Sequence, residues 1–192
     1  MRPRFVLASG SPRRRQLLSE AGYTFEVVTS PADEVAHDWV TIRELTIWNA
    51  ARKAAPVSEM RPDAVVLAAD TLVTVNGRVL GKPADFEDAV SMLRRLSGRV
   101  HEVCTAVRIV DRARRKSLSF HVMSRVHFRT LNDGAIRNYL AKIDPLDKAG
   151  AYAAQGDGKD IIEKIDGSYT NVVGLPMEET ARALFPFGVT PL

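Results

Sequence analysis

The sequence predicts an α/β protein, and two observations support this fold class. Short apolar stretches alternate with segments of helical pattern along the chain, which is typical of α/β folds. The 192 residues are 45% hydrophobic and 26% charged, a composition typical of a globular protein long enough to bury a core. No repeat, low-complexity tract or clear linker interrupts the chain, so we expect a single domain over residues 1–192.

The first elements alternate between strand and helix. Residues 5–8 are short and apolar, which predicts a buried strand. Ser11 and Pro12 then have the pattern of an N-cap and a first helical residue, so a helix is predicted to run to about Gly22. The alternation in residues 23–29 predicts a second strand.

A capping box predicts the next helix. Thr41 and Glu44 have the required spacing. We expect this helix to end soon after Lys53 and to turn three residues toward the core: Leu45, Trp48 and Ala51.

The central part of the chain has strong strand signals. Residues 64–75 are rich in Val and Leu, and the Asn76-Gly77 turn predicts a hairpin with a return strand at residues 78–81. Asp85 then caps a helix that ends before Gly98. Two long strands follow, and the apolar residues of the second recur at every other position: Leu118, Phe120, Val122, Val126 and Phe128.

The C-terminal third predicts two helices around a long loop. Asn132 or Asp133 caps the first, and the second begins at Leu175-Pro176 and ends near Phe185. The loop between them, residues 144–160, is long and polar, as functional loops often are. We expect the tail, residues 188–192, to be loose.

Composition excludes several classes of protein. No apolar run is long enough to span a membrane, and the N-terminal apolar stretch is too short for a signal peptide, so we expect a cytoplasmic protein. The single cysteine, Cys104, lies in an apolar run and is expected to be buried and inert. The net charge of +4 suits an anionic small molecule, whereas no nucleic-acid-binding motif is present. We interpret the basic stretch at residues 112–116 as a solvated hairpin turn.

The turn that joins the first strand to the first helix indicates phosphate binding. Backbone N–H groups at a helix start are free to bind an anion. Arg13 and Arg14 lie in the first helical turn, where cations oppose the helix dipole unless an anion lies among them. A solvated pair of arginines on a surface helix is the alternative.

Asp70 is the strongest catalytic candidate. It ends a run of apolar residues that should be buried, so its carboxylate must face a site, form an ion pair or bind a metal. Carboxylates are the ligands that Mg²⁺ and Mn²⁺ prefer. A structural aspartate that caps a turn is the alternative.

Three further residues are weaker candidates. Lys82 follows Gly81 in a segment that resembles a P-loop, but Pro83 stands where a P-loop requires Ser or Thr. Lys82 therefore remains a phosphate contact or an ordinary surface lysine. Gln155 in the long loop could read the edge of a base, because its amide both donates and accepts. Glu34, in the acidic pair 33–34, could equally face water.

Several collinear motifs together resemble the Maf family of nucleotide pyrophosphatases. The motifs are residues 7–14, 33–34, 69–71, 81–83, 96–98, 101–107, 151–156 and 167–176. This resemblance implies a twisted mixed β-sheet with flanking helices, with two lobes around a cleft, similar to the inosine triphosphatase fold. It also implies cleavage of the α–β phosphoanhydride of a nucleoside triphosphate with a divalent cation, Mg²⁺ or Mn²⁺, and a homodimer is plausible.

The resemblance assigns roles to individual residues. It implies that Asp70 accepts the proton of the attacking water and contacts the metal, with Glu34 near the metal. The residues expected to bind the triphosphate are Ser9, Arg14, Lys53 and Lys82. The Lys53 assignment rests on the Lys-Ala pair alone, because the Arg-Leu-Ala pattern usual before it is absent.

Base selection is expected to separate the branches of the family. Arg13, Thr71 and Gln155 match the branch that hydrolyses dTTP and UTP. Two alternatives stay open: a pyrophosphatase of the 7-methyl-GTP type, and a nucleotide-binding regulator of septum formation.

Overall fold

The protein is described from a computed structural model that covers residues 2–33, 35 and 40–192. It is an α/β protein, as the sequence predicts. In chain order the elements are β1 (Arg4–Leu7), α1 (Pro12–Glu20), β2 (Glu26–Val27), α2 (Ile42–Met60), β3 (Ala64–Val75), β4 (Arg78–Leu80), α3 (Phe86–Leu96), β5 (Val100–Asp111), β6 (Lys116–Phe128), α4 (Asp133–Leu140), η1 (Ala149–Ala151), α5 (Gly158–Ile161), β7 (Ile162–Asp166), α6 (Tyr169–Val173), α7 (Met177–Leu184) and η2 (Phe185–Phe187).

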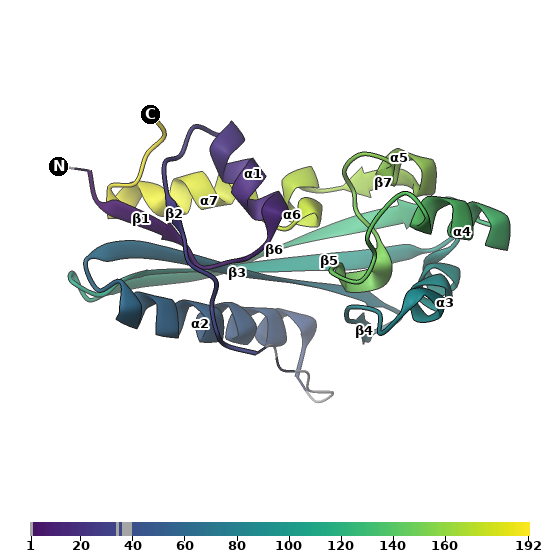
Figure 1. Ribbon diagram of the computed structural model, residues 1–192, viewed down its shortest axis with the longest axis horizontal. Helices are drawn as coiled ribbons and strands as arrows, with labels where there is room; N and C mark the ends of the chain where they lie inside the picture. Colours follow the sequence, from purple (N-terminus) through teal and green to yellow (C-terminus); the bar gives the residue numbers. More distant parts are fainter. Residues whose placement is uncertain (1, 34, 36–39) are drawn as a thin grey trace. The chain divides into compact units, whose positions relative to one another are not determined.

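The described residues form a seven-stranded mixed sheet (Figure 1). Six strands follow the order β2-β1-β3-β5-β6-β7, and β4 pairs with β3 outside this path. β1 is parallel to both β2 and β3, whereas β4 is antiparallel to β3 and β7 is antiparallel to β6. The mixed sheet that the family resemblance implies is therefore confirmed.

The chain divides into two compact units. Unit 1 comprises Met1–Asp70, Thr105–Val122 and Gly174–Leu192, and unit 2 comprises Thr71–Cys104 and Met123–Val173. The strands β3, β5 and β6 each contribute residues to both units.

Unit 1 has a core of small residues on one face of its strands. Alternate residues of β1 and β3 turn toward α2, and they pack with two residues of that helix in one cluster: Val6, Ala8, Ala54, Val57, Ala64, Val66 and Ala68. Small side chains allow the helix backbone to approach the sheet closely. Figure 1 shows α2 on one side of β1 and α7 on the other.

Unit 2 has a larger core of aliphatic and aromatic residues. Seven residues of α3 and α4 are buried in it: Ala89, Met92, Leu93, Leu96, Ile136, Tyr139 and Leu140. Val126 and Phe128 of β6 join this core, whereas Leu118, Phe120 and Val122 on the same face are only half-buried.

The helix α2 corrects three sequence predictions. It continues to Met60 through Pro56, so Lys53 lies in its middle and not near its end. Trp48, expected in the core, is 51% exposed, and Ala51 is only half-buried. The buried stripe instead contains three polar residues, Thr46, Asn49 and Ser58, which an apolar pattern cannot reveal. The capping box of Thr41 and Glu44 is confirmed.

Other elements differ in detail. β2 covers only Glu26–Val27, where the chain pairs with β1, and not the whole of residues 23–29. Ser11 lies at the N-cap of α1, but its side chain makes no capping hydrogen bond. Two short elements, β7 and α6, are absent from the sequence prediction, because five residues are too few to show a clear period.

The C-terminal tail is packed and not loose. Val189 is buried, and the backbone N–H of Leu192 donates to the carbonyl of Gly22 at 2.9 Å.

The predicted hairpin turn at residues 112–115 is confirmed, and Cys104 is buried. Among the described residues, no helix has the length and apolar character needed to cross a membrane.

Candidate active site

The carboxyl ends of parallel strands bring the unit 1 candidates together. Leu7 of β1 pairs with Leu67 of β3 and with Val27 of β2, and the N–H of Ala8 donates to the carbonyl of Leu67 at 2.7 Å. β1 ends here, whereas β3 continues past Asp70. The turn that contains Ser9 therefore lies beside the part of β3 that carries Asp70, at the edge where α/β sheets usually bind ligands.

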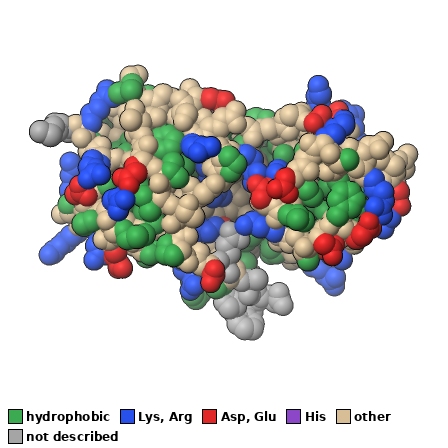
Figure 2. Space-filling model, viewed as in Figure 1, with side chains coloured by type: hydrophobic (Ala, Val, Ile, Leu, Met, Phe, Trp, Pro, Cys, Tyr) green, Lys and Arg blue, Asp and Glu red, His purple; other side chains and the backbone are tan. Residues whose placement is uncertain are grey.

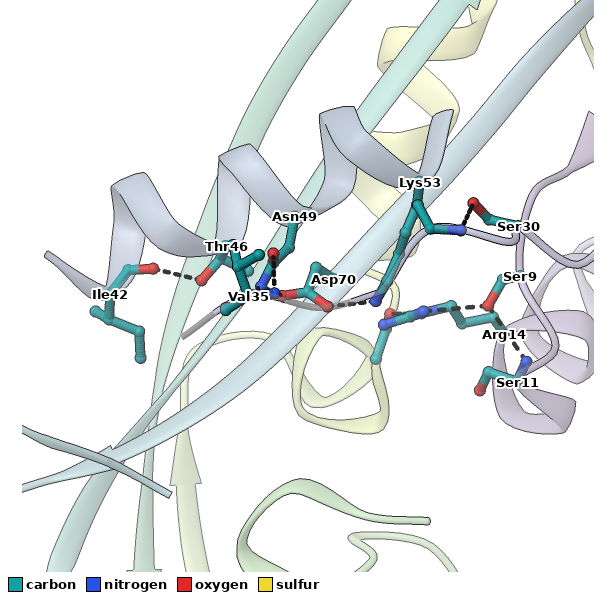
Figure 3. A network of polar contacts seen from close by, with 12 residues as sticks. Ser9, Ser11, Arg14, Ser30, Val35, Ile42, Thr46, Asn49, Lys53 and Asp70 are labelled. Carbon is teal, nitrogen blue, oxygen red and sulfur yellow. Dashed lines mark hydrogen bonds and ion pairs between the residues drawn. The ribbon is translucent and has the colours of Figure 1, made fainter. Parts of the chain in front are cut away.

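Ser9, in the turn before α1, and Arg14, in the first turn of α1, belong to one hydrogen-bond network (Figure 3). The Ser9 hydroxyl accepts from Nη1 of Arg14 at 3.1 Å and from the N–H of Ser11 at 3.2 Å. Nε of Arg14 donates to the carbonyl of Gly174 at 2.8 Å, and Arg14 is only 8% exposed. Burial and these contacts hold the guanidinium in one orientation at the start of the helix.

Asp70 is a buried carboxylate that contacts two side chains of α2 (Figure 3). It is 1% exposed, and its Oδ1 accepts from Nζ of Lys53 at 2.5 Å. Its Oδ2 accepts from Nδ2 of Asn49 at 3.3 Å. Asn49 and Lys53 are four residues apart, so they project from the same face of the helix. The structure therefore brings the predicted Lys53 and Asp70 together.

Asn49 is a site residue that sequence reasoning missed. Its Oδ1 accepts from the N–H of Val35 at 3.1 Å, and its Nδ2 also donates to the Val35 carbonyl at 3.2 Å. One amide thus holds Asp70 and the chain at Val35. The signal available in the sequence was a polar residue that lies four positions before Lys53 among apolar residues of the same helix.

A divalent cation that is shared with substrate phosphates needs few protein ligands. Within the described ranges, no group of three or more His, Cys, Asp or Glu side chains could hold a metal ion. Mg²⁺ is commonly held by one or two carboxylates together with substrate phosphates, and Asp70 provides one such carboxylate. Glu34, the second predicted ligand, lies outside the described residues.

The remaining candidates are spread over both units. Arg13 in unit 1 is half-buried. In unit 2, Thr71 and Gln155 are half-buried, and Lys82 is exposed after β4. The carbonyl of Gly81, next to Lys82, accepts from the N–H of Gly150 at 2.9 Å, which ties the Lys82 segment to the loop that leads to Gln155.

Two tyrosines hold the segment before Gln155. The Tyr139 hydroxyl donates to the Ala153 carbonyl at 3.2 Å and accepts from the Ala153 N–H at 3.0 Å. The Tyr152 hydroxyl lies 2.7 Å from Nε2 of His101. Burial raises the pKa of Tyr139 to about 12 and raises the pKa of Tyr152 above its ordinary value. Both hydroxyls therefore stay protonated at neutral pH.

His101 is neutral at physiological pH. Its burial, together with the nearby charge of His127, lowers its pKa to about 4. Its ring packs edge-on against Phe128 and Tyr152, with centroids 4.8 and 5.3 Å away. His121, by contrast, is exposed, and His127 bonds to Asp166 at 2.8 Å, so these two lie on the polar face of β6.

Comparison with known proteins identifies the family of this chain. The family model described as "Maf-like protein" matches residues 4–187. A protein of Pelotomaculum thermopropionicum named dTTP/UTP pyrophosphatase is 48% identical over 187 residues, which cover 97% of this chain and 98% of that protein. Proteins of the same name from Akkermansia muciniphila and Bdellovibrio bacteriovorus are each 44% identical, and the matches cover 98% and 97% of this chain and 98% and 100% of those proteins. The chain therefore belongs to the Maf family.

Proposed function

We propose that this protein is a nucleoside triphosphate pyrophosphatase that hydrolyses dTTP and UTP to the nucleoside monophosphate and pyrophosphate. The buried Asp70–Lys53 pair at the carboxyl edge of the parallel strands carries the proposal for the reaction. The substrates are inferred from the names of relatives that match almost the full length of this chain at 44–48% identity.

In the proposed reaction, Asp70 accepts a proton from the water that attacks the α-phosphorus. A positioned general base of this kind contributes about 10²–10⁴-fold to a rate. Lys53 and Asn49 hold the carboxylate in place until substrate binds. The pyrophosphate then leaves with its negative charge balanced by cationic side chains, which orient it for departure.

Phosphate binding is assigned to the turn before α1 and to two lysines. Ser9 and Arg14 are held by their mutual hydrogen bond, so little entropy is lost when they bind a phosphate. Lys53 and Lys82 would contribute point charges.

A divalent cation, Mg²⁺ or Mn²⁺, is part of the proposal. Asp70 and Glu34 would hold it together with the substrate phosphates, and it would supply charge neutralisation and polarisation of the phosphoryl oxygens.

Base selection is assigned to Arg13, Thr71 and Gln155. The Gln155 amide is suited to a pyrimidine edge, because it can donate to one base atom and accept from another.

We place the enzyme in the cytoplasm, where it acts on free nucleotides and not on nucleic acid or membranes. We also expect a homodimer, and sedimentation at several protein concentrations tests this oligomeric state.

Pyrophosphate release from a panel of nucleoside triphosphates tests the proposal, with the wild type compared with Asp70→Asn and with the exposed control Asp133→Asn. We expect the wild type and Asp133→Asn to hydrolyse dTTP and UTP, and we expect Asp70→Asn to be inactive. The hydrolysis should require Mg²⁺ or Mn²⁺. Preference for 7-methyl-GTP would place the protein in the sister branch. Failure to hydrolyse any triphosphate would favour the regulatory alternative and overturn the proposed reaction.

A further inference from the structure

The hairpin between β5 and β6 contains a basic hollow in unit 1. Its volume is about 350 Å³, and its lining includes four basic residues, one carboxylate and one hydroxyl: Arg108, Arg112, Arg115, Lys116, Asp111 and Ser117. We refer to it as the hairpin hollow. The carboxylate, Asp111, is buried and pairs with Arg114 at 3.4 Å, so it does not balance the four cations.

The cations of the hairpin hollow contact mostly neutral groups. The Arg108 guanidinium donates to the hydroxyls of Ser119 at 3.1 Å and Ser117 at 2.9 Å. Nζ of Lys116 donates to the Pro186 carbonyl at 2.6 Å and lies over the Phe187 ring. Such contacts fix the direction of a cation without cancelling its charge.

The two remaining arginines have little compensation. Arg112 pairs with the exposed Glu59 at 3.3 Å, a solvated contact of small energy. No carboxylate in the part of the chain that the structure describes forms an ion pair with Arg115. On the face of the molecule drawn in Figure 2, basic and acidic side chains are interspersed. Four cations around one hollow repel one another unless an anion lies among them.

The backbone at Arg115 has an unusual conformation for this residue type. Its φ is 50°, in the left-handed region that Gly and Asn adopt at lower cost. Its N–H donates to the Arg112 carbonyl at 3.1 Å, so the turn fixes the backbone from which the Arg115 side chain extends.

The hairpin hollow is separate from the proposed active site. Arg112 contacts Glu59 near the C-terminal end of α2, and the turn lies beside that end in Figure 1. Lys53 precedes Glu59 by six residues, which is about 9 Å along a helix. None of the residues that line the hollow contacts Asp70, Lys53 or Ser9 in the hydrogen bonds described above.

We propose that the hairpin hollow binds a polyphosphate anion, with inorganic pyrophosphate as the simplest example. Guanidinium groups match phosphate oxygens in a two-pronged geometry, and several such groups favour an anion with more than one phosphate. The volume is at the low end for ligand pockets, which suits a small anion. This site is independent of the proposed hydrolysis, because it uses no residue of the active site.

Calorimetric titration of the full chain with inorganic pyrophosphate tests this site, with EDTA present so that no divalent cation assists binding. The test variant is Arg108→Gln/Arg115→Asn, in which Asn suits the left-handed backbone, so folding is retained. The control, Arg95→Gln/Arg129→Gln, removes the same charge from two exposed positions of unit 2. We expect the hairpin variant to weaken pyrophosphate binding about tenfold or more, with the control close to the wild type and dTTP hydrolysis retained in both.

Three results would overturn this site. Unchanged affinity in the hairpin variant would place pyrophosphate elsewhere, and equal weakening in the control would indicate general charge attraction. Salt-sensitive binding of a DNA duplex that pyrophosphate does not displace would identify a nucleic acid as the occupant.

Discussion

Asp70 and Lys53 form a buried ion pair in which each charge stabilises the other. The side chains are 2% and 13% exposed, so both charges depend on each other and on Asn49 for compensation. Removing one partner of such a pair leaves an uncompensated buried charge, which costs far more than the pair contributes.

We predict that Lys53→Met lowers the free energy of unfolding by about 3 kcal/mol, because it leaves the Asp70 carboxylate buried without its cation. The double variant Lys53→Met/Asp70→Asn should recover most of this loss while remaining inactive. Urea denaturation and pyrophosphate release measure the two effects.

The matched control is the exposed pair of Arg94 and Asp133, which is equally short at 2.5 Å but 51% and 62% exposed. Arg94→Met should change stability much less than Lys53→Met, because water already solvates both charges. Equal losses at the two pairs would contradict this account.

His101 makes stability depend on pH. Its pKa is about 4 in the folded protein and about 6.5 in an unfolded chain, so the unfolded state binds a proton more readily. Folding stability from this residue is therefore complete above about pH 6.5 and is lost as the pH falls toward 4. The full loss is about 3 kcal/mol.

We predict that His101→Gln flattens this part of the pH dependence of unfolding. The groups that surround His101 are the Tyr152 hydroxyl, the Phe128 ring and the His127 charge, and the variant leaves them in place. Chemical denaturation at several pH values measures the slope. His121→Gln, at an exposed histidine, should have the same slope as the wild type. An unchanged slope in His101→Gln would show that His101 does not cause this part of the pH dependence.

At the scale of elements, the loop before Gln155, which contains the short helix η1, is held by hydrogen bonds from other parts of unit 2. The Tyr139 hydroxyl of α4 satisfies both backbone groups of Ala153, and Gly150 bonds to the loop after β4. Backbone groups held in this way cannot move independently of the helix. The position of Gln155 therefore depends on a residue sixteen positions away along the chain.

We predict that Tyr139→Phe raises the KM for dTTP and reduces the preference for dTTP over GTP, with little change in kcat. The hydroxyl is removed and the Ala153 backbone is released, at a cost of about 1 kcal/mol in stability. Steady-state kinetics with both substrates measure this preference as the ratio of kcat/KM for dTTP to kcat/KM for GTP. Tyr23→Phe, which removes one hydroxyl from unit 1, should leave the ratio unchanged; equal losses for dTTP and GTP in Tyr139→Phe would show that the hydroxyl only stabilises the fold.

At the scale of the molecule, each unit is assembled from segments distant in sequence. Unit 1 includes the start of the chain, the β5–β6 hairpin and the C-terminal residues. The C-terminus packs against the α1–β2 turn, where Leu192 bonds to Gly22, while Arg114 of the hairpin donates to the carbonyl of Phe187. The last residues therefore contribute to the stability of unit 1.

We predict that removing residues 189–192 lowers the free energy of unfolding by about 2 kcal/mol, because the buried Val189 is lost. Removing residues 191–192 alone should cost much less, since both side chains are exposed. Thermal unfolding of the two truncations separates the cases. Equal melting temperatures would mean that Val189 contributes nothing.

The sequence by itself determined the α/β class, the long strands, the capped helices and the presence of a carboxylate, Asp70, at the end of a buried apolar run. These features depend on local signals, such as the capping box at Thr41 and Glu44 or a charge at the end of an apolar run, which neighbouring residues produce whatever the rest of the chain does. The family motifs were recognisable for the same reason, because each is a short stretch of fixed residues.

Only the tertiary structure decided which polar residues meet. Asn49 reaches Asp70 from a helix, the Tyr139 hydroxyl reaches Ala153 across the core of unit 2, and the tail reaches Gly22. Trp48 is exposed because the stripe of α2 that faces the sheet contains Thr46 and Asn49 in place of apolar residues. Contacts between residues far apart in sequence follow from how the elements pack, and no local pattern in the chain records that packing.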